Sequence, residues 1–237
     1  RRVELAQRAR TRVIESRAVI DKALAGGLPI YGVTTGFGKL SDVRIQQDEI
    51  RQLQLNLLRS HACGLGKPLS EPEVRAAVLL RANCLAKGFS GVRPEIIDAL
   101  LDLLNKGVHP VVPSRGSVGA SGDLAPCAHM ALVLIGEGEA FYQGERLPGA
   151  VALTRAGMRP LTPEAKEGLS LLNGTQFMSA VGGLALVRAA DLVDTADVAA
   201  ALSLEVLLGS LVADDMRIHA VRPHPGQQAT AHNIVSL

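Results

Sequence analysis

The stretch TQFMSAVGGLALVRAADLVDTADVAAALSLEVLLGSLVA, residues 175–213, is helix-forming over almost its whole length and is the strongest indication of the fold class. A helix of about forty residues spans about 60 Å at about 1.5 Å per residue. A single small globule does not cover an apolar stripe of that length, so the stretch predicts a bundle with neighbouring helices, which other chains can supply. The 237-residue sequence is 47% hydrophobic but 3% aromatic, which is typical of aliphatic helices packed on helices. We therefore predict a mainly α, elongated helical bundle.

Weaker patterns place further elements before and after this stretch. A short hairpin is expected over residues 139–147, around Gly144, and another helix begins as the sequence reaches Leu237, so we expect the protein to continue there. Glycine-rich loops are expected to interrupt the helical pattern at 28–40, 108–121 and 171–176. Apolar periodicity and helix start signals predict helices over residues 3–25, 46–60, 72–87, 94–106 and about 123–136.

The composition argues against several classes of protein. A net charge of +2, evenly spread, does not indicate nucleic-acid binding, and no spacing of residues fits a metal site, a P-loop or a dinucleotide fingerprint. Charged residues interrupt the apolar stretch 180–211, so no membrane span is expected. Cys63, Cys84 and Cys127 are widely spaced and are expected to be small buried side chains without disulfides, in a reducing cytoplasm.

The loop GSVGASGDLAP, residues 116–126, is too rich in small residues to contribute much to a core. In a tight bend, the amide nitrogen of Gly122 can approach the carbonyl carbon of Ala120, because glycine has no Cβ to block the approach. Cyclisation with loss of water, followed by loss of the Ser121 hydroxyl, would give a ring with an exocyclic methylene. Such a group is an electrophile, which ordinary side chains do not supply. The alternative for these residues is a tight turn in which Asp123 or Ser121 caps the following helix.

Three motifs together resemble the aromatic amino acid ammonia-lyase family, in the order and at the spacing of that family. They are YGVTTGFG at 31–38, GSVGASGDLAP at 116–126 and LLNGTQ at 171–176. The resemblance covers essentially the whole chain and implies a helical fold of the fumarase/aspartase-like type. It also implies a prosthetic group, 4-methylidene-imidazol-5-one (MIO), formed from Ala120, Ser121 and Gly122 without any external cofactor.

The resemblance further implies roles for single residues of the site. Asp123 corresponds to an aspartate that assists cyclisation, and Asn173 to an amide that hydrogen-bonds near the prosthetic group and the substrate. Tyr31 corresponds to the base that removes the β-proton. A phenol needs nearby positive charge or a helix N-terminus to act as a base near neutral pH.

Ser60 and His61, in the segment RSHACG, bear on the choice of substrate. In the family, Ser-His at this place is typical of members that act on L-histidine, which would give trans-urocanate and ammonia. Selectivity for phenylalanine or tyrosine, or an aminomutase reaction, is the first alternative, and a non-catalytic helical scaffold is the second. His61 has a plainer interpretation as a partner of a helix C-terminus.

Members of the family are about twice as long as this chain and form homotetramers whose active sites combine residues from several subunits. We therefore divide the chain into an MIO-bearing region, residues 1–174, and the start of the central helix bundle, residues 175–237. The arginine that binds the substrate carboxylate falls in the half of the family fold absent here. We accordingly expect little or no turnover of the amino acid substrate by residues 1–237 alone.

Overall fold

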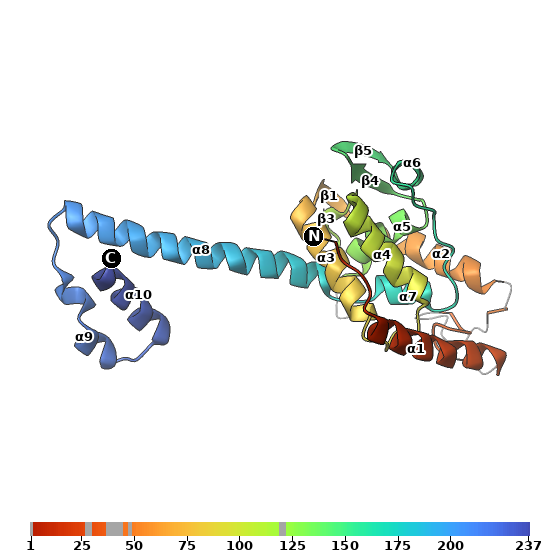
Figure 1. The fold of residues 1–237 in the computed structure, drawn as a ribbon, viewed down its shortest axis with the longest axis horizontal. Helices are drawn as coiled ribbons and strands as arrows, with labels where there is room; N and C mark the ends of the chain where they lie inside the picture. Colours follow the sequence, from red (N-terminus) through yellow and green to blue (C-terminus); the bar gives the residue numbers. More distant parts are fainter. Residues whose placement is uncertain (1, 27–29, 37–44, 47–48, 119–121) are drawn as a thin grey trace. The chain divides into compact units, whose positions relative to one another are not determined.

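The computed structural model describes residues 2–26, 30–36, 45–46, 49–118 and 122–237, and it is 61% helical (Figure 1). This confirms the prediction of a mainly α fold. The α-helices are α1 (Gln7–Ala25), α2 (Ile50–His61), α3 (Glu71–Leu85), α4 (Pro94–Lys106), α5 (Leu124–Leu134), α6 (Gly149–Arg155), α7 (Glu167–Leu172), α8 (Gln176–Val206), α9 (Met216–Ala220) and α10 (Pro225–Ser236). A 3₁₀ turn, η2, covers Leu211–Asp214.

Local signals explain where two of the predicted helices, α3 and α4, begin, and where α4 ends. Helix α3 begins with a capping box in which Ser70 and Glu73 satisfy each other's exposed groups. Helix α4 begins with Pro94 in its first turn and ends before Gly107, which adopts a left-handed conformation at φ 70°. Both helices match their predicted ranges to within two residues at each end.

Two small sheets lie beside the helices, and only one of them was expected. The predicted hairpin is confirmed as β4 (Glu139–Tyr142) and β5 (Glu145–Pro148), with Ala140 paired to Leu147. A third strand, β2 (Val108–Pro110), pairs antiparallel with β4, while β1 (Leu65–Pro68) pairs with β3 (Pro113–Arg115). The expectation of a loop over 108–121 was therefore wrong for Val108–Pro110 and Pro113–Arg115. Pro110 and Pro113 lie at strand ends, where a missing N–H donor is tolerated.

The main core is aliphatic and lies among α2, α3, α4, α5 and α7. Helix α4 contributes Ile96, Ile97, Leu100 and Leu103, all with no exposed surface, at a spacing that places them on one face. Burying one such side chain contributes about 1.5–3 kcal/mol, so this single face is a major contributor to stability. The core thus has the aliphatic composition that the scarcity of aromatic residues predicts.

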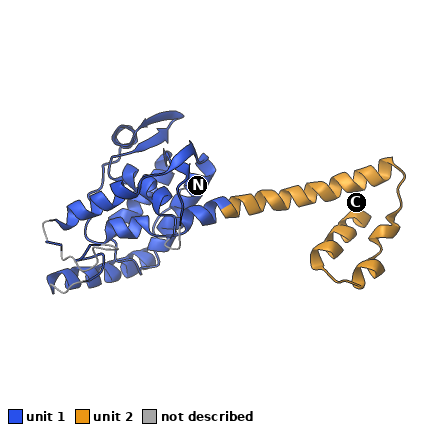
Figure 2. Cartoon of the chain, turned by 180° about the vertical axis from the view of Figure 1, so that it is seen from behind, with its two compact units in different colours: residues 1–181 blue, residues 182–237 orange. Residues whose placement is uncertain are grey.

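The chain divides into two compact units, residues 1–181 and residues 182–237, with the boundary inside α8 (Figure 2). Within the second unit, α9, η2 and α10 contact one another, and Asn233 Nδ2 on α10 donates to Asp197 Oδ2 on α8 at 2.8 Å. The division at residues 174/175 inferred from sequence stays a prediction.

Helix α8 is shorter than the predicted 175–213 because a local motif ends it. Leu208 adopts a left-handed conformation at φ 51°, and its N–H donates to the carbonyl of Glu205. The N–H of Gly209 donates to the carbonyl of Leu204 at 2.7 Å. This pair of bonds is a Schellman motif, which satisfies carbonyls left open by the end of the helix.

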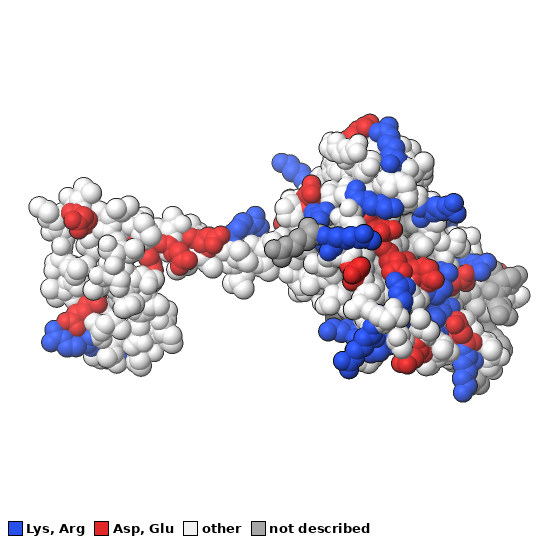
Figure 3. All heavy atoms as spheres, in the orientation of Figure 1, with Lys and Arg blue, Asp and Glu red and all other residues white. Residues whose placement is uncertain are grey.

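One helical stretch among the described residues, Glu167–Val206, is long and apolar enough to cross a membrane by length and composition alone. Of its most apolar 18 residues, 11% are buried. The expectation that no stretch meets this criterion was wrong, because the charged residues are spaced widely enough to leave an apolar window between them. On the face drawn in Figure 3, the second unit carries few charged side chains, whereas acidic and basic side chains are interspersed over the first unit.

Candidate active site

The loop before α5 and the bend between α7 and α8 meet through their backbones. The N–H of Asp123 donates to the carbonyl oxygen of Gly174 at 2.6 Å. Gly122 has φ +102°, and a Cβ built on it would lie 2.5 Å from the same oxygen. Only glycine fits this contact without a shift of the backbone. Two of the motifs identified in the sequence are therefore in direct contact, while Ala120 and Ser121 lie outside the described residues.

Asp123 is 1% exposed, and its carboxylate accepts two hydrogen bonds from different parts of the chain. Oδ1 accepts from Ser117 Oγ at 2.6 Å, and Oδ2 accepts from the backbone N–H of Met178 at 2.7 Å. Met178 lies in the first turn of α8, where N–H groups lack helical partners and the helix dipole favours a negative charge. Asp123 sits at the N-cap position of α5, but its side chain does not cap that helix. Its carboxylate instead joins the 116–123 loop to the start of α8.

Arg81 on α3 also contacts this bend and was missed in the sequence analysis. The side chain is 3% exposed; Nη1 donates to Gln176 Oε1 at 2.8 Å, and Nη2 donates to the carbonyl of Ser170. Burial lowers the pKa of the guanidinium, although the neighbouring thiols of Cys127 and Cys84 act in the opposite direction. A sequence signal existed, because this arginine interrupts the apolar stripe of α3 formed by Val74, Ala77, Val78, Ala82 and Leu85.

Ser60 and His61 lie at the C-terminal end of α2 and bond back to that helix. His61 Nδ1 lies 2.9 Å from the carbonyl oxygen of Leu57, and Ser60 Oγ donates to the same oxygen at 3.1 Å. Since a carbonyl only accepts, the contact assigns the ring hydrogen to Nδ1 and leaves Nε2 of a neutral His61 as an acceptor. His61 thus contacts the helix C-terminus, as its plainer interpretation expected, and still has one ring nitrogen able to receive a hydrogen bond.

His129 on α5 ties the segment after His61 to the same region. The N–H of Gly64 donates to His129 Nε2 at 3.1 Å, and burial lowers the pKa of His129, which favours the neutral ring that this bond requires. A Cβ on Gly116 would lie 3.0 Å from Gly64 Cα, so the loop of the central motif also touches this segment. The described part of the central motif therefore contacts both the segment at Gly64 and the bend at Gly174.

The remaining predicted site residues are Tyr31 and Asn173. Tyr31 lies in the turn 31–34 and is 58% exposed. Asn173 follows α7 at its C-cap and is also exposed. The contacts given above among the described residues do not involve either side chain, and the roles assigned to them stay predictions.

The cysteines differ from the expectation of three buried side chains. Cys127 is buried, and burial raises the pKa of its thiol to about 12. Cys63 and Cys84 are exposed in this chain, so that expectation was wrong for two of the three. Cys63 lies in the loop after α2, and Cys84 lies in the last turn of α3.

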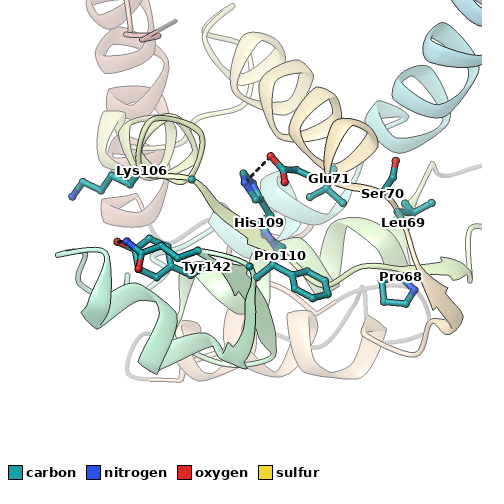
Figure 4. Close-up of a pocket in the computed structure, with 13 residues that line it drawn as sticks. Pro68, Leu69, Ser70, Glu71, Lys106, His109, Pro110 and Tyr142 are labelled. Atoms are coloured by element: carbon teal, nitrogen blue, oxygen red, sulfur yellow. Dashed lines mark hydrogen bonds and ion pairs between the residues drawn. The ribbon is translucent and has the colours of Figure 1, made fainter.

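A cavity of about 640 Å³ lies elsewhere in the first unit, between the start of α3 and strands β2 and β4 (Figure 4). His109 and Glu71 contact each other in its lining, with His109 Nε2 3.1 Å from Glu71 Oε1. Burial lowers the pKa of His109, and this outweighs the attraction of Glu71. None of the predicted site residues lines this cavity, so we do not assign the reaction to it.

A sequence model of the aromatic amino acid lyase family matches residues 1–237, and the chain belongs to this family. Histidine ammonia-lyase of Myxococcus xanthus is 59% identical over 232 residues, which are 98% of this chain and 46% of that protein. The crystal structure of histidine ammonia-lyase from Trypanosoma cruzi superposes with a TM-score of 0.91 at 40% identity, over 100% of this chain and 45% of that one. Phenylalanine aminomutase of Pantoea agglomerans also gives a TM-score of 0.91, at 34% identity, over 99% of this chain and 45% of that one.

The chain spans about half the length of the relatives it matches. The family resemblance stated from the motifs is confirmed by these comparisons. The fold alone does not distinguish a lyase from an aminomutase, because both kinds of structure superpose equally well. Sequence identity is higher with the histidine ammonia-lyases.

Proposed function

We propose that this chain is the N-terminal part of an ammonia-lyase that converts L-histidine to trans-urocanate and ammonia. The observation that carries the proposal is the contact of Gly122 and Asp123 with Gly174, which brings two of the three family motifs together. The 59% identity with a histidine ammonia-lyase and the Ser60–His61 pair support L-histidine as the substrate.

We propose that MIO forms from Ala120, Ser121 and Gly122. The geometry of Gly122 fits this, because its backbone has a positive φ and packs where a Cβ would collide with Gly174. When formed, this group supplies an electrophile that makes the amino group of the substrate a better leaving group. No external cofactor is needed for that chemistry.

The chain's own residues perform the other tasks in this proposal. Asp123 holds the loop against the start of α8, and its two hydrogen bonds fix the direction of the backbone that follows the ring. Tyr31 removes the β-proton, and Asn173 donates a hydrogen bond near the substrate. His61 accepts a hydrogen bond at Nε2 from an N–H of the substrate imidazole, which a leucine at this place does not offer.

We propose a homotetramer as the active form, with the remainder of the site supplied by the rest of the protein and by neighbouring subunits. The supporting observation is the apolar surface of α8, because exposed apolar surface of this extent marks an interaction site. The exposed side chains are Leu186, Val187, Leu192, Val193, Val198, Leu202 and Val206. We place the protein in the cytoplasm, since all three cysteines are free thiols.

An ultraviolet assay on the protein from its complete coding sequence tests the substrate. We expect trans-urocanate from L-histidine, and much lower turnover of L-phenylalanine and L-tyrosine at equal concentration. Faster turnover of either aromatic substrate, or formation of a β-amino acid, would favour the alternative lyases or an aminomutase. If none of the three amino acids is turned over and the 116–126 loop has lost no water, the non-catalytic scaffold is favoured.

A further inference from the structure

The guanidinium of Arg81 holds both ends of the bend that separates α7 from α8. Nη2 donates to the carbonyl of Ser170 in α7, and Nη1 donates to the side-chain oxygen of Gln176, the first residue of α8, at 2.8 Å. Asn173 and Gly174 lie between these two acceptors. A guanidinium is planar and its donors are fixed relative to one another, so a single group sets the span of the bend.

Arg81 also fills the space beside Gly174. A Cβ on Gly174 would lie 2.2 Å from Arg81 Nη1 and 2.1 Å from Gln176 Oε1. Gly174 in turn receives the N–H of Asp123 and packs against Gly122. A shift of Gly174 therefore passes directly to the residue that provides the ring nitrogen.

The fold alone gives little reason for a cation at this place. Arg81 is 3% exposed. Within the described residues, no carboxylate forms an ion pair with its guanidinium, and its Nε has no hydrogen-bond partner. Burying a charge without an opposite charge opposes folding. Local conflicts of this kind concentrate at functional sites.

We infer that Arg81 is a positioning residue for formation of the prosthetic ring, acting through Gly174 on Gly122. The inference rests on the proposed function. In the step it promotes, a bond forms between Gly122 N and the carbonyl carbon of Ala120, and the carbonyl oxygen leaves as water with the amide hydrogens of Gly122 and Ser121. A second water then leaves, made from the Ser121 hydroxyl and the Ser121 α-hydrogen. Arg81 exchanges no proton in either step.

The test follows ring formation in time, in protein made from the complete coding sequence. The tryptic peptide Gly116–Arg146 is weighed at successive times after a pulse of synthesis, because loss of two waters lowers its mass by about 36 Da. The variant is Arg81→Met, and the control is Arg75→Met on the same helix, where Nη1 donates to the carbonyl of Leu104 at 3.3 Å. We expect ring formation to be about a hundredfold slower in Arg81→Met, as for a misplacement of reacting atoms by about 1 Å. Arg75→Met should match the unchanged protein.

A second variant keeps the inference testable if Arg81→Met does not fold. Gln176→Leu removes one acceptor of Arg81 from a partly exposed place, and we expect about tenfold slower ring formation from the loss of one bond to a charged group. Ring formation at the unchanged rate in a folded Arg81→Met protein, or in Gln176→Leu, would overturn the inference alone. If the unchanged protein never loses the two waters, the proposed prosthetic group fails first and the inference fails with it.

Discussion

Replacement of Asp123 by asparagine or alanine separates the hydrogen bonds of this side chain from its charge. Asp123→Ala removes two bonds to a buried carboxylate, from Ser117 Oγ and from the N–H of Met178. Bonds to charged groups contribute about 1.5–3 kcal/mol each, so we expect the free energy of unfolding to fall by about 3–6 kcal/mol. In Asp123→Asn, the amide oxygen can accept from Met178 while the NH₂ group donates to Ser117 Oγ, whose hydroxyl can rotate.

Two neutral bonds contribute about 0.5–1.5 kcal/mol each, so Asp123→Asn should be less stable than the unchanged protein by about 2–3 kcal/mol. Equilibrium urea unfolding measures both variants, and the mass of the Gly116–Arg146 peptide reports ring formation. We expect Asp123→Asn to retain most of the dehydrated peptide and Asp123→Ala to lose it. A folded Asp123→Ala protein within about 1 kcal/mol of the unchanged one, with its ring complete, would refute the positioning role of the carboxylate.

Three further predictions concern residues around this contact. Gly122→Ala should be less stable by at least about 1–3 kcal/mol because of the positive φ at this position, and its peptide should keep both waters. A variant of unchanged stability whose peptide is dehydrated would contradict the close packing of Gly122 on Gly174. Because the pKa of His129 is lowered in the folded state, its contribution to stability is complete above the ordinary pKa near 6.5 and is lost as the pH falls. Urea unfolding at about pH 7.5 and about pH 5.5 should show a larger loss in the unchanged protein than in His129→Gln, which keeps an acceptor but does not titrate; equal losses would contradict this. Cys127 should resist a maleimide reagent until urea unfolds the protein, given its buried thiol with a pKa of about 12; rapid labelling in the native state would contradict its burial.

The elements that local signals specify could be predicted from the sequence. Helices α3 and α4 carry their start signals within a few residues, and the β4–β5 hairpin has Gly144 at its turn with φ 82°. Strands β2 and β3 were not predicted because each contains a proline, which ordinarily indicates the end of a strand. Proline is tolerated at a sheet edge, where its missing N–H is not needed. Whether a strand lies at a sheet edge depends on the tertiary structure, which local sequence does not specify.

In the candidate site, too, local motifs predict some residues, whereas others are brought in only by the tertiary structure. Gly122 and Asp123 are marked by the motif around them, but the partners of Asp123 are not, since Met178 contributes only a backbone N–H from 55 residues away. Arg81 lies 89 residues from Ser170 and 95 from Gln176, and no local pattern links them. The sequence predicts which residues carry the chemistry, whereas the residues that hold them depend on the packing of α3, α5 and α8.

The mass of the tryptic peptide Gly116–Arg146, from protein made from its complete coding sequence, tests ring formation directly. Ring formation from Ala120, Ser121 and Gly122 predicts a peptide lighter by two waters, about 36 Da, with fragment ions that confine the loss to these three residues. In Ser121→Ala the serine-derived loss should be absent. A peptide of unmodified mass from correctly folded protein would contradict the formation of the ring from these residues.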